Sequence, residues 1–511
     1  MKKAKNTIVR STVVLTIFST FIKFLGLIKQ ATIASYCGAT IETDAFFIST
    51  GILVQLCVVI FSAISISLLT LHTDTLVKEG RKKSNELING VLQVFIPISI
   101  GITIVFFAFA PVVAKLFAPA YKDNELIVLS RYIRIMSCSF ILWCYFLILN
   151  VILETDKEFI PGKGQAFFQN LFLILAAIFL SGTKGIDSLV YGFLLSGLAE
   201  CILVTWCVKK RFNIIFRKIN VSDKIRRLIS LSFPLIVGSA IYEINDIVDK
   251  QISSGLGEGQ ISCLTYGGTI NDIVTGVIVT SVSTVLFSHF TTMIVEGNIK
   301  NIEITLSKIN MYLIMAIFPI MVLCIGAGDQ IVSILYGRGN FQHENVMTTY
   351  GVVVGYAVGF IFQSVRSNLV KVFYAFQDTK RPMINGAISV TTNILLSFIL
   401  SKYFGVAGVA LATSIAMILV TILLLKDIKK YLPDYSIFIN ASEYIKGMIS
   451  AILVTALLYF MRNNISGNEF YIFVGEAATV LITYIVLLLL LRSRCIYTVI
   501  DMLKKNQKRI D

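Results

Sequence analysis

Long apolar runs recur from one end of the chain to the other, separated by short polar stretches. Two examples are VLQVFIPISIGITIVFFAFAPVVA at 91–114 and FLILAAIFL at 172–180. One helix needs roughly 20 apolar residues to cross a bilayer core about 30 Å thick. The pattern therefore predicts an all-α polytopic membrane protein with about fourteen membrane helices.

The apolar runs place the expected helices to within about 2–4 residues at each end. Their ranges are 8–36, 45–72, 87–113, 127–153, 161–181, 187–208, 228–253, 261–293, 305–326, 346–375, 383–403, 406–427, 443–461 and 470–491. The start, MKKAKNTIVRSTVVLTIF, has the basic front of a signal peptide, but no small-residue cleavage site follows it. We therefore interpret it as the first membrane helix, retained in the protein.

The basic residues of the polar stretches predict the orientation of the chain. Lys and Arg are frequent in VKEGRKKSNE, KKRFNIIFRKINVSDKIRR, KDIKKYLPD and the tail KKNQKRID, and rare in SYCGATIETDA, SGTKG, SGLGEG and NNISGNEF. Loops rich in Lys and Arg stay in the cytoplasm. We expect a protein of the bacterial cytoplasmic membrane with both termini in the cytoplasm.

Composition excludes several other classes of protein. Hydrophobic residues make up 56% of the 511 positions and charged residues only 15%, and the net charge of +15 belongs to short loops rather than to a nucleic-acid surface. The nine cysteines are scattered without a CxxC pair, and His72, His289 and His343 stand alone, so we expect no metal site. No GxxxxGK[ST] loop is present, so we expect neither nucleotide nor cofactor.

A weak internal repeat appears when the sequence is shifted by about 220 residues. The matched segments are KQATIASYCG with KQISSGLGEG, AKLFAPAY with SILYGRGN, ETDKEFIP with FQDTKRP, and GIDSLVYG with GVAGVALA. The offset spans six expected helices, so both halves enter the membrane in the same sense, as parallel repeats do in some transporters. We predict two pseudosymmetric six-helix lobes at 1–210 and 211–430, followed by two further helices and a cytoplasmic tail at 431–511.

Charged residues inside apolar helices are the main functional signal. Lys23 and Lys29 lie in the first expected helix, where a charge at mid-bilayer costs about 2.5–3.5 kcal/mol even on insertion scales. Such residues usually face the interior of a bundle. The alternative for Lys23 is that its side chain reaches the membrane surface. We expect both lysines to face a water-filled cavity, with Gly26 between them permitting a bend.

The seventh expected helix carries four ionisable residues within one short segment. Glu243, Asp246 and Lys250 are three and four positions apart and share a face, and Asp249 stands next to Lys250. Internal salt bridges would explain some of these residues without any transport role. The acidic three are the best candidates for coupling transport to Na⁺ or H⁺, and the sequence leaves the choice of ion open.

Other charged residues in the helices and loops carry weaker signals. Arg366 lies in the tenth expected helix as a further cation, whereas Lys371 is expected near the inner surface. Arg338, between two glycines of LYGRGNF, would either hold a phosphate or cap a turn. Glu200 and Glu476 stand singly in apolar helices, where we expect paired structural carboxylates.

The duplication relates the first and seventh helices, and both carry a Lys-Gln pair at the matched place, at 29–30 and at 250–251. The two lobes would then present ammonium groups across one cavity. Coulomb attraction grows as the dielectric constant falls, so a shielded cluster of cations suits an anion such as phosphate. The lysines therefore predict binding of a negatively charged head group.

Several motifs resemble those of the MviN/MurJ-type flippases of the MOP exporter superfamily, over roughly residues 1 to 430. FLGLIKQATIASYCGATIETDAFF is similar to their LGFxRDxxxAxxFGAGxxTDAF, and LYGRGNF to their LFxRGxF. VFYAFQDTKRP is similar to FYAxxDTxTP, and GVAGVALATSIA to GxxGLALATSxA. The resemblance implies fourteen helices in two lobes. It also implies transfer of an undecaprenyl-pyrophosphate-linked sugar, such as lipid II, to the outer leaflet.

The resemblance assigns roles to individual residues. Lys23 and Lys29 fall where the family has arginines, Asp44 matches the aspartate of TDAF, Arg338 the arginine of RGxF, and Asp249 an aspartate in the seventh helix. These positions, with Lys250 and Arg366, are the expected head-group and coupling residues.

The sequence departs from the family pattern at two further basic positions. Cys57 and Val58 stand where the family usually has a basic pair, and Thr269 stands where an arginine is expected. Lys250 is absent from the family pattern and restores some positive charge. The cargo is therefore either lipid II or another lipid-linked glycan, such as a capsule, teichuronic-type or exopolysaccharide unit.

Three other functions compete with a glycan-lipid flippase. A MATE-like exporter of amphipathic cations would favour an acidic cavity rather than a basic one. A membrane glycosyltransferase or polymerase would need a catalytic loop domain or a paired-carboxylate site, and the short outer loops supply neither. A scaffold without transport activity would not explain charges inside the membrane.

Overall fold

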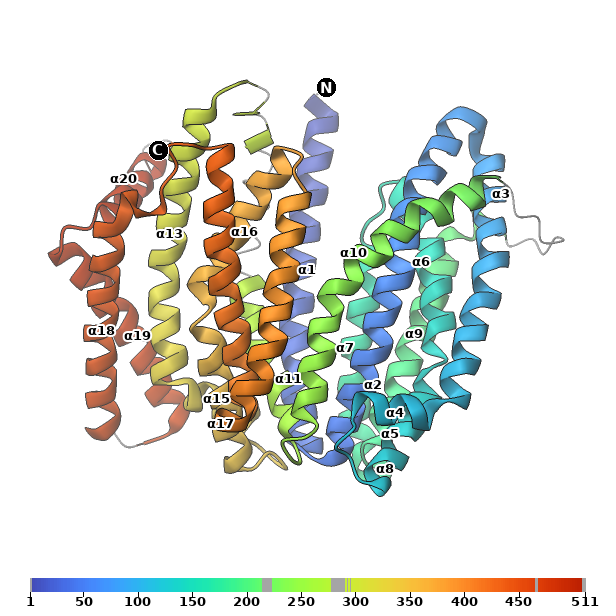
Figure 1. Cartoon of the computed structure of the whole chain (residues 1–511), viewed down its shortest axis with the longest axis horizontal. Coiled ribbons are helices and arrows are strands. Elements are labelled where there is room, and N and C mark those ends of the chain that lie inside the picture. Colours follow the sequence, from blue (N-terminus) through green and yellow to red (C-terminus); the bar gives the residue numbers. More distant parts are fainter. Residues whose placement is uncertain are drawn as a thin grey trace. The chain divides into compact units, whose positions relative to one another are not determined.

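The chain folds into helices throughout the part that the structure describes. This computed structural model describes residues 2–213, 223–276, 290–291, 293–294, 296–464 and 467–507. No strand occurs within those ranges, so the all-α class predicted from the apolar runs is confirmed (Figure 1).

The helices follow one another with short connections. In the first half they are α1 (Lys2–Cys37), α2 (Ile41–Cys57), the π-helical turn η1 (Val58–Ser62), α3 (Ala63–Ala108), α4 (Ala110–Phe117), α5 (Asp123–Met136), α6 (Ser139–Thr155), the 3₁₀ turn η2 (Pro161–Lys163), α7 (Gly164–Phe179), α8 (Ser181–Lys184), α9 (Asp187–Val208) and α10 (Asp223–Ser253). In the second half they are α11 (Gln260–Val274), α13 (Ile299–Gly326), α14 (Gly328–Tyr336), α15 (His343–Ala357), α16 (Phe360–Ala375), α17 (Lys380–Asp427), the 3₁₀ turns η4 (Ile428–Lys430) and η5 (Ile437–Asn440), α18 (Ala441–Asn464), α19 (Glu469–Leu490) and α20 (Arg494–Gln507).

Nine stretches of the described residues are long and apolar enough to cross a membrane, and a tenth is counted if α15 and α16, bent by 45°, form one span. The predicted count of fourteen is therefore not confirmed. Two of the nine stretches, Ile41–Ala108 and Lys380–Lys430, are each interrupted by one glycine whose backbone leaves the helical region, Gly80 in α3 and Gly405 in α17. Each of these stretches contains two of the expected spans.

Besides the span at 346–375, which corresponds to the bent pair α15 and α16, two expected spans are not among those nine stretches. The span at 228–253 corresponds to α10. The span at 261–293 begins with α11 but runs into residues 277–289, which lie outside the described part of the chain.

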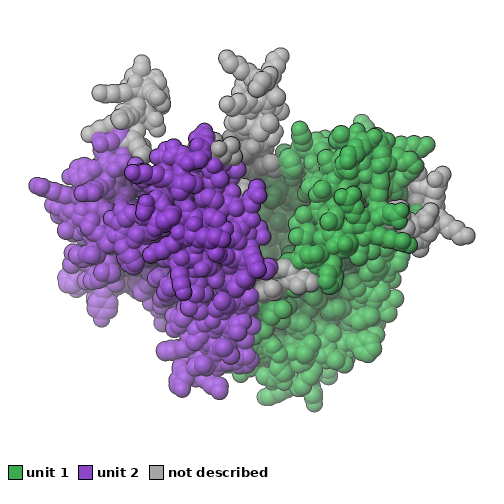
Figure 2. Space-filling model, turned by 45° about the horizontal axis from the view of Figure 1, so that its top comes forward, with its two compact units in different colours: residues 1–262, 339–342 green, residues 263–338, 343–511 purple. Residues whose placement is uncertain are grey.

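Contacts divide the chain into two compact units (Figure 2). The first consists of residues 1–262 and 339–342, and the second of residues 263–338 and 343–511. Contacts thus group α10 with the helices that precede it, whereas the duplication groups it with those that follow. The lobe boundaries at residues 210 and 430 rest on the duplication and stay predictions.

The duplication is visible in the backbone of the two halves. Lys157 (φ 63°) and Gln377 (φ 60°), two of the three described non-glycine residues with positive φ, lie 220 positions apart. Gly185 (φ 56°, ψ −142°) and Gly405 (φ 57°, ψ −143°) are separated by the same interval. Such rare conformations recur at one offset because each half repeats the same chain path.

A side-chain contact is also repeated, with different chemistry in each half. In the first unit the guanidinium of Arg211 donates to Glu158 over 2.6 Å. At the equivalent positions of the second unit the hydroxyl of Tyr431 donates to Asp378 over 2.9 Å. Burial acts to raise the pKa of Asp378, but the backbone N–H of Arg381 and the Tyr431 hydroxyl outweigh it and hold that pKa below its usual value. The fold preserves the contact while the residue types diverge.

Close helix packing in the first unit relies on small residues. Gly192 of α9 lies against α7, where an added Cβ would come within 2.8 Å of the Ala176 side chain and 3.1 Å of the Phe172 carbonyl oxygen. Small residues at such crossings let the helices of membrane proteins approach closely.

The second unit encloses an apolar core and presents an apolar surface. The core cluster comprises Phe290, Ile302, Leu306, Ile314, Val365, Leu369, Val372, Phe373, Ala375, Val420, Leu424, Ile428, Leu432 and Tyr435. The outer faces of α18 and α19 expose Ile452, Tyr459, Ile482 and Leu490. In water such a surface would promote association, whereas in a bilayer it contacts lipid.

Alanine at either repeated glycine should destabilise the protein by a similar amount. The conformation of Gly185 and Gly405 is open essentially to glycine alone, and each site has free space for a methyl group, so only the backbone is strained. We expect Gly185→Ala and Gly405→Ala each to lower stability by about 1–3 kcal/mol, measured by thermal unfolding in detergent.

Gly182→Ala is the matched control for this pair, because Gly182 has free space around it and no positive φ. A fall in unfolding temperature confined to one of the two glycine variants would contradict a shared backbone design.

Candidate functional site

A polar cluster joins α2 to α10 within the first unit. The ammonium of Lys250 pairs with Asp246 over 2.7 Å, and the amide of Gln55 donates to the same carboxylate oxygen. The Lys250 side chain lies directly over Gly51, where a Cβ would overlap its ammonium group. Because Gly51 has no side chain, the Lys250 side chain can pack directly against α2.

The charged residues near the end of α10 form one salt bridge and one further hydrogen bond within the helix. Asp246 binds Lys250, as the salt-bridge alternative proposed, and Asp249 is buried and accepts a hydrogen bond of 3.2 Å from the amide of Asn245. Glu243 is half-buried and interacts electrostatically with Asp246 and Lys250. The three acidic residues are therefore held close together on one helix, and their assignment to ion coupling stays a prediction.

The two lysines of α1 differ in their surroundings. Lys23 is exposed and Lys29 is half-buried on a helix that continues without a break past Gly26, so the expected bend is absent. α1 is fastened to α7, where the amide of Asn170 donates to the carbonyl oxygen of Ile22 over 3.2 Å. The extra turn of helix beyond Gly26 carries Lys29 away from the exposed environment of Lys23.

The two arginines predicted for the site belong to the second unit. Arg366 is half-buried in α16, and Arg338 is exposed just after α14. Lys23, Lys29, Lys250 and Asp44 all belong to the first unit. Convergence of cations from both halves on one chamber therefore stays a prediction.

Asp44 is buried in the first unit and is bound by groups of the protein. Its carboxylate is 1% exposed and accepts hydrogen bonds from the backbone N–H groups of Gly259 (2.8 Å) and Ser262 (2.7 Å) and from the Ser262 hydroxyl (2.5 Å). These donors are the first amides of α11, where a carboxylate is a favourable cap. Both oxygens are thus engaged by the protein, and contact with a head group stays a prediction.

Further contacts surround Asp44 and bring three distant segments of the first unit together. The backbone N–H of Ile41 donates to Glu258 over 3.3 Å, and the backbone N–H of Asn340 donates to the carbonyl oxygen of Ser35 over 2.8 Å. We call this group, formed by residues 35–44, 258–262 and 339–342, the Asp44 clasp. Its first two segments are the turns that the duplication relates to each other.

Sequence reasoning missed a buried polar network near the bend of α3. His72 is fully buried, and its ring nitrogens lie 2.9 Å from the Thr155 hydroxyl and 2.5 Å from the Ser84 hydroxyl. Arg81 binds both oxygens of Asp156 over 2.9 and 2.8 Å. The sequence showed His72 as isolated because its partners are 12 and 83 positions away.

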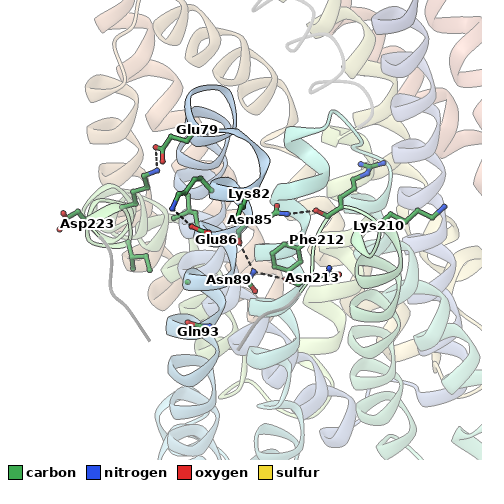
Figure 3. Close-up of a pocket in the computed structure, with 16 residues that line it drawn as sticks. Glu79, Lys82, Asn85, Glu86, Asn89, Gln93, Lys210, Phe212, Asn213 and Asp223 are labelled. Carbon is green, nitrogen blue, oxygen red and sulfur yellow. Dashed lines mark hydrogen bonds and ion pairs between the residues drawn. The ribbon is translucent and has the colours of Figure 1, made fainter. Parts of the chain in front are cut away.

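A polar cavity of about 1010 Å³ lies beside this network in the first unit (Figure 3). Its lining comes from α3, from the end of α9 with the residues after it, and from the start of α10. Asn85 and Asn89 of α3 donate to the carbonyl oxygens of Arg211 and Asn213, and Lys224 pairs with Glu79 over 2.5 Å. These contacts fasten both ends of the α9–α10 connection to α3.

The two positions that depart from the family pattern are neutral in the structure as well. Cys57 is 1% exposed at the end of α2. Thr269 is half-buried in α11, and its hydroxyl donates to the carbonyl oxygen of Thr265 over 2.9 Å. Neither position can supply the positive charge that the pattern expects there.

Long apolar helices that also carry lysines and carboxylates define a class of protein. Charges placed inside a bundle of membrane helices typically mark a pathway for substrate or ion. The chain is a multi-pass membrane transporter rather than an enzyme.

Comparison with known proteins identifies the family. A family model described as "Lipid II flippase MurJ" matches residues 33–474. The lipid II flippase MurJ of Thermosipho africanus (strain TCF52B) is 26% identical over 467 residues, which cover 91% of this chain and 93% of that protein. The chain therefore belongs to the lipid II flippase MurJ family, whose place is the bacterial inner membrane.

Solved structures agree with this assignment. A lipid II flippase MurJ in an inward closed conformation superposes with a TM-score of 0.81 at 25% identity, covering 93% of this chain and 98% of that one. An inward-facing MATE multidrug transporter of the MOP superfamily gives a TM-score of 0.66 at 12% identity, covering 86% of this chain and 95% of that one. The MATE likeness shows a shared fold alone.

Replacing the carboxylate of the clasp should weaken the first unit. In Asp44→Asn the amide keeps one acceptor oxygen but turns an NH₂ group towards backbone N–H donors. Hydrogen bonds to a charged group contribute about 1.5–3 kcal/mol each, so we expect a loss of about 2–3 kcal/mol, measured as a lower unfolding temperature in detergent.

Glu42→Gln, an exposed carboxylate in the same first turn of α2, is the matched control and should leave stability unchanged. Equal stability of Asp44→Asn and the unaltered protein would show that the capping contacts contribute nothing.

Proposed function

We propose that this protein translocates an undecaprenyl-pyrophosphate-linked glycan, lipid II or a related polysaccharide unit, from the inner to the outer leaflet by alternating access. The match of the family model to residues 33–474 carries the proposal. Support also comes from relatives named as lipid II flippases over more than nine-tenths of both chains. The direction assumes that both termini lie in the cytoplasm, as the loop charges predict.

The lysines supply the chemistry that a diphosphate needs. Lys29 is half-buried on α1, and the Lys250 side chain is only 18% exposed, so both interact with an anion through a medium of low dielectric constant. A diphosphate would compete with Asp246 for the Lys250 ammonium, and the amide of Gln55 would remain to satisfy Asp246. Lys23, Arg366 and Arg338 are the further proposed contacts.

Alternating access requires one side of the transporter to close while the other opens. The Asp44 clasp joins the two repeat-related turns at residues 35–44 and 258–262 through charge-assisted hydrogen bonds. We infer that the clasp closes one side in this conformation and separates when that side opens. Coupling to Na⁺ or H⁺ at Asp249, Asp246 or Glu243 would supply the driving force.

The neutral residues at positions 57 and 269 bear on the cargo. Without arginines there, the protein holds fewer cations than the family pattern, and lysine contacts phosphate as a point charge rather than as a two-pronged donor. A site with these fewer cations favours a cargo whose only strong charge is its diphosphate over a cargo that carries further negative charges. A MATE-like export function is the alternative that the shared fold suggests.

Complementation tests the cargo directly. Expression of this protein in bacteria depleted of their own lipid II flippase should restore growth. A MATE exporter of the same fold, expressed at the same level, should not restore growth.

Failure to restore growth, combined with restored polymer export in a strain lacking its polysaccharide-unit flippase, would assign the cargo to polysaccharide units. Failure in both strains would reject the flippase proposal.

Neutralising the two lysines should reduce transport without unfolding the protein. We expect Lys29→Gln and Lys250→Gln each to lower the rate of translocation of a fluorescent lipid II in proteoliposomes at least about tenfold, because an ion contact with phosphate is lost. Lys250→Arg retains the charge and should recover part of the rate.

Lys402→Gln, an exposed lysine of α17, is the control and should transport normally. Unchanged rates in both lysine variants, at unchanged unfolding temperature, would remove Lys29 and Lys250 from the proposed site.

A further inference from the structure

Four buried oxygen atoms in the second unit lack a hydrogen-bond donor among the described residues. They are Oδ1 of Asp329 and Oε1 of Gln330, on the first turn of α14, and both carboxylate oxygens of Glu476 on α19. Glu476 is 0% exposed. Buried acceptors without donors are rare because each loses its contacts with water and gains nothing in return.

These three side chains belong to one electrostatic group. The Gln330 side chain lies beside Glu476, and Asp329 and Arg462 both act on the Glu476 carboxylate. α14 and α19 also meet at a second point, where the Ser333 hydroxyl donates to Glu469 over 2.7 Å. The acceptors therefore line one joint between the two helices.

Apart from the Gln330 amide, which interacts with the Glu476 carboxylate, the neighbouring donors are committed elsewhere. Arg462 of α18 donates to Oδ2 of Asp329, the oxygen that is not among the four, and to the carbonyl oxygen of Gly326 over 2.6 Å. The hydroxyl of Tyr350 donates to the carbonyl oxygen of Ile325 over 2.6 Å. Turning the Gln330 amide would supply one N–H and would still leave acceptors without donors.

The charges of the group do not balance. With Asp329 and Glu476 both ionised, the group has two negative charges against the single positive charge of Arg462. Glu476 is fully buried, whereas the Asp329 and Arg462 side chains are 25% and 28% exposed. A buried net charge of this kind calls for one more positive charge.

We propose that Asp329, Gln330 and Glu476 form a binding site for a monovalent hard cation, Na⁺. Carboxylate and amide oxygens are the ligands that hard cations prefer, and no nitrogen or sulfur ligand is needed. A single positive charge neutralises the group, whereas a divalent ion would replace a negative excess with a positive one. The site is independent of the proposed cargo and of the acidic residues on α10.

The position of the site suggests what the cation stabilises. α14 belongs to the duplicated part of the chain, whereas α18 and α19 have no counterpart in the first half. A cation held by Asp329, Gln330 and Glu476 would tie the appended helix pair to the duplicated part. Its binding should therefore stabilise the folded second unit.

Thermal unfolding of the purified full-length protein in detergent tests the site. NaCl replaces choline chloride at constant ionic strength, so only the identity of the cation changes. We expect the unfolding temperature to rise by a few degrees with rising Na⁺ and to reach a plateau. Glu476→Gln should abolish the Na⁺-dependent rise.

Glu200→Gln provides the matched control, because Glu200 of α9 is a buried carboxylate with an unpartnered oxygen in the first unit. It should keep the full response to Na⁺. If Glu476→Gln does not fold, Gln330→Met replaces it and should raise the Na⁺ concentration at half-response at least tenfold.

Three results would overturn the proposal. One is an unfolding temperature that is the same in Na⁺ and in choline. Another is a full Na⁺ response in Glu476→Gln or an unshifted response in Gln330→Met. The third is stabilisation by acid alone, without any response to Na⁺, which would assign a proton rather than Na⁺ to Glu476.

Discussion

A polar or charged group that is buried away from water must find its partner within the protein, and this constraint organises the structure. Asp44 illustrates it most fully, because three donors from the start of α11 satisfy both of its oxygens. Lys250 likewise has a partner in the protein, because its ammonium forms a salt bridge with Asp246. Such pairing is required, because a buried polar group without a partner would cost several kcal/mol of free energy. The polar contacts therefore determine which helices of the first unit lie together. The apolar residues on the outer faces of the helices can contact lipid without such partners.

The fold followed from features that repeat along the sequence. Apolar runs and loop charges are local features, and the offset of about 220 residues is a periodic one. Each can therefore be recognised in the sequence alone. The paired conformations at Lys157 and Gln377 confirm the offset at positions where the two sequences share no residue type. The span count is not confirmed, because neighbouring spans follow one another directly across the kinks at Gly80 and Gly405, and the expected span at 261–293 extends beyond the described residues.

The site was predictable in its residue types but not in its pairings. The charges of α10 were visible, and the salt bridge of Asp246 with Lys250 was foreseen because it lies within one helix turn. The partners of Asp44 lie more than 200 positions away, and those of Glu476 are in a different helix, so no spacing rule links them. His72 failed to stand out for the same reason. Sequence patterns report neighbours along one helix, whereas membrane sites are assembled across several helices.

Duplication followed by divergence explains why the two halves solve the same problem differently. The contact between Arg211 and Glu158 corresponds to one between Tyr431 and Asp378, so the second half keeps the carboxylate but takes its opposing charge from Arg381, at a different position. A second charged group of the second half, Arg462 with Asp329 and Glu476, joins α14 of the duplicated part to the appended helices α18 and α19. The duplication determines the path of the backbone and therefore where helices cross. It does not determine which of these crossings carry charged side chains. Substitutions at a few crossings therefore change the charges of the bundle, while the path of the chain stays the same in both halves.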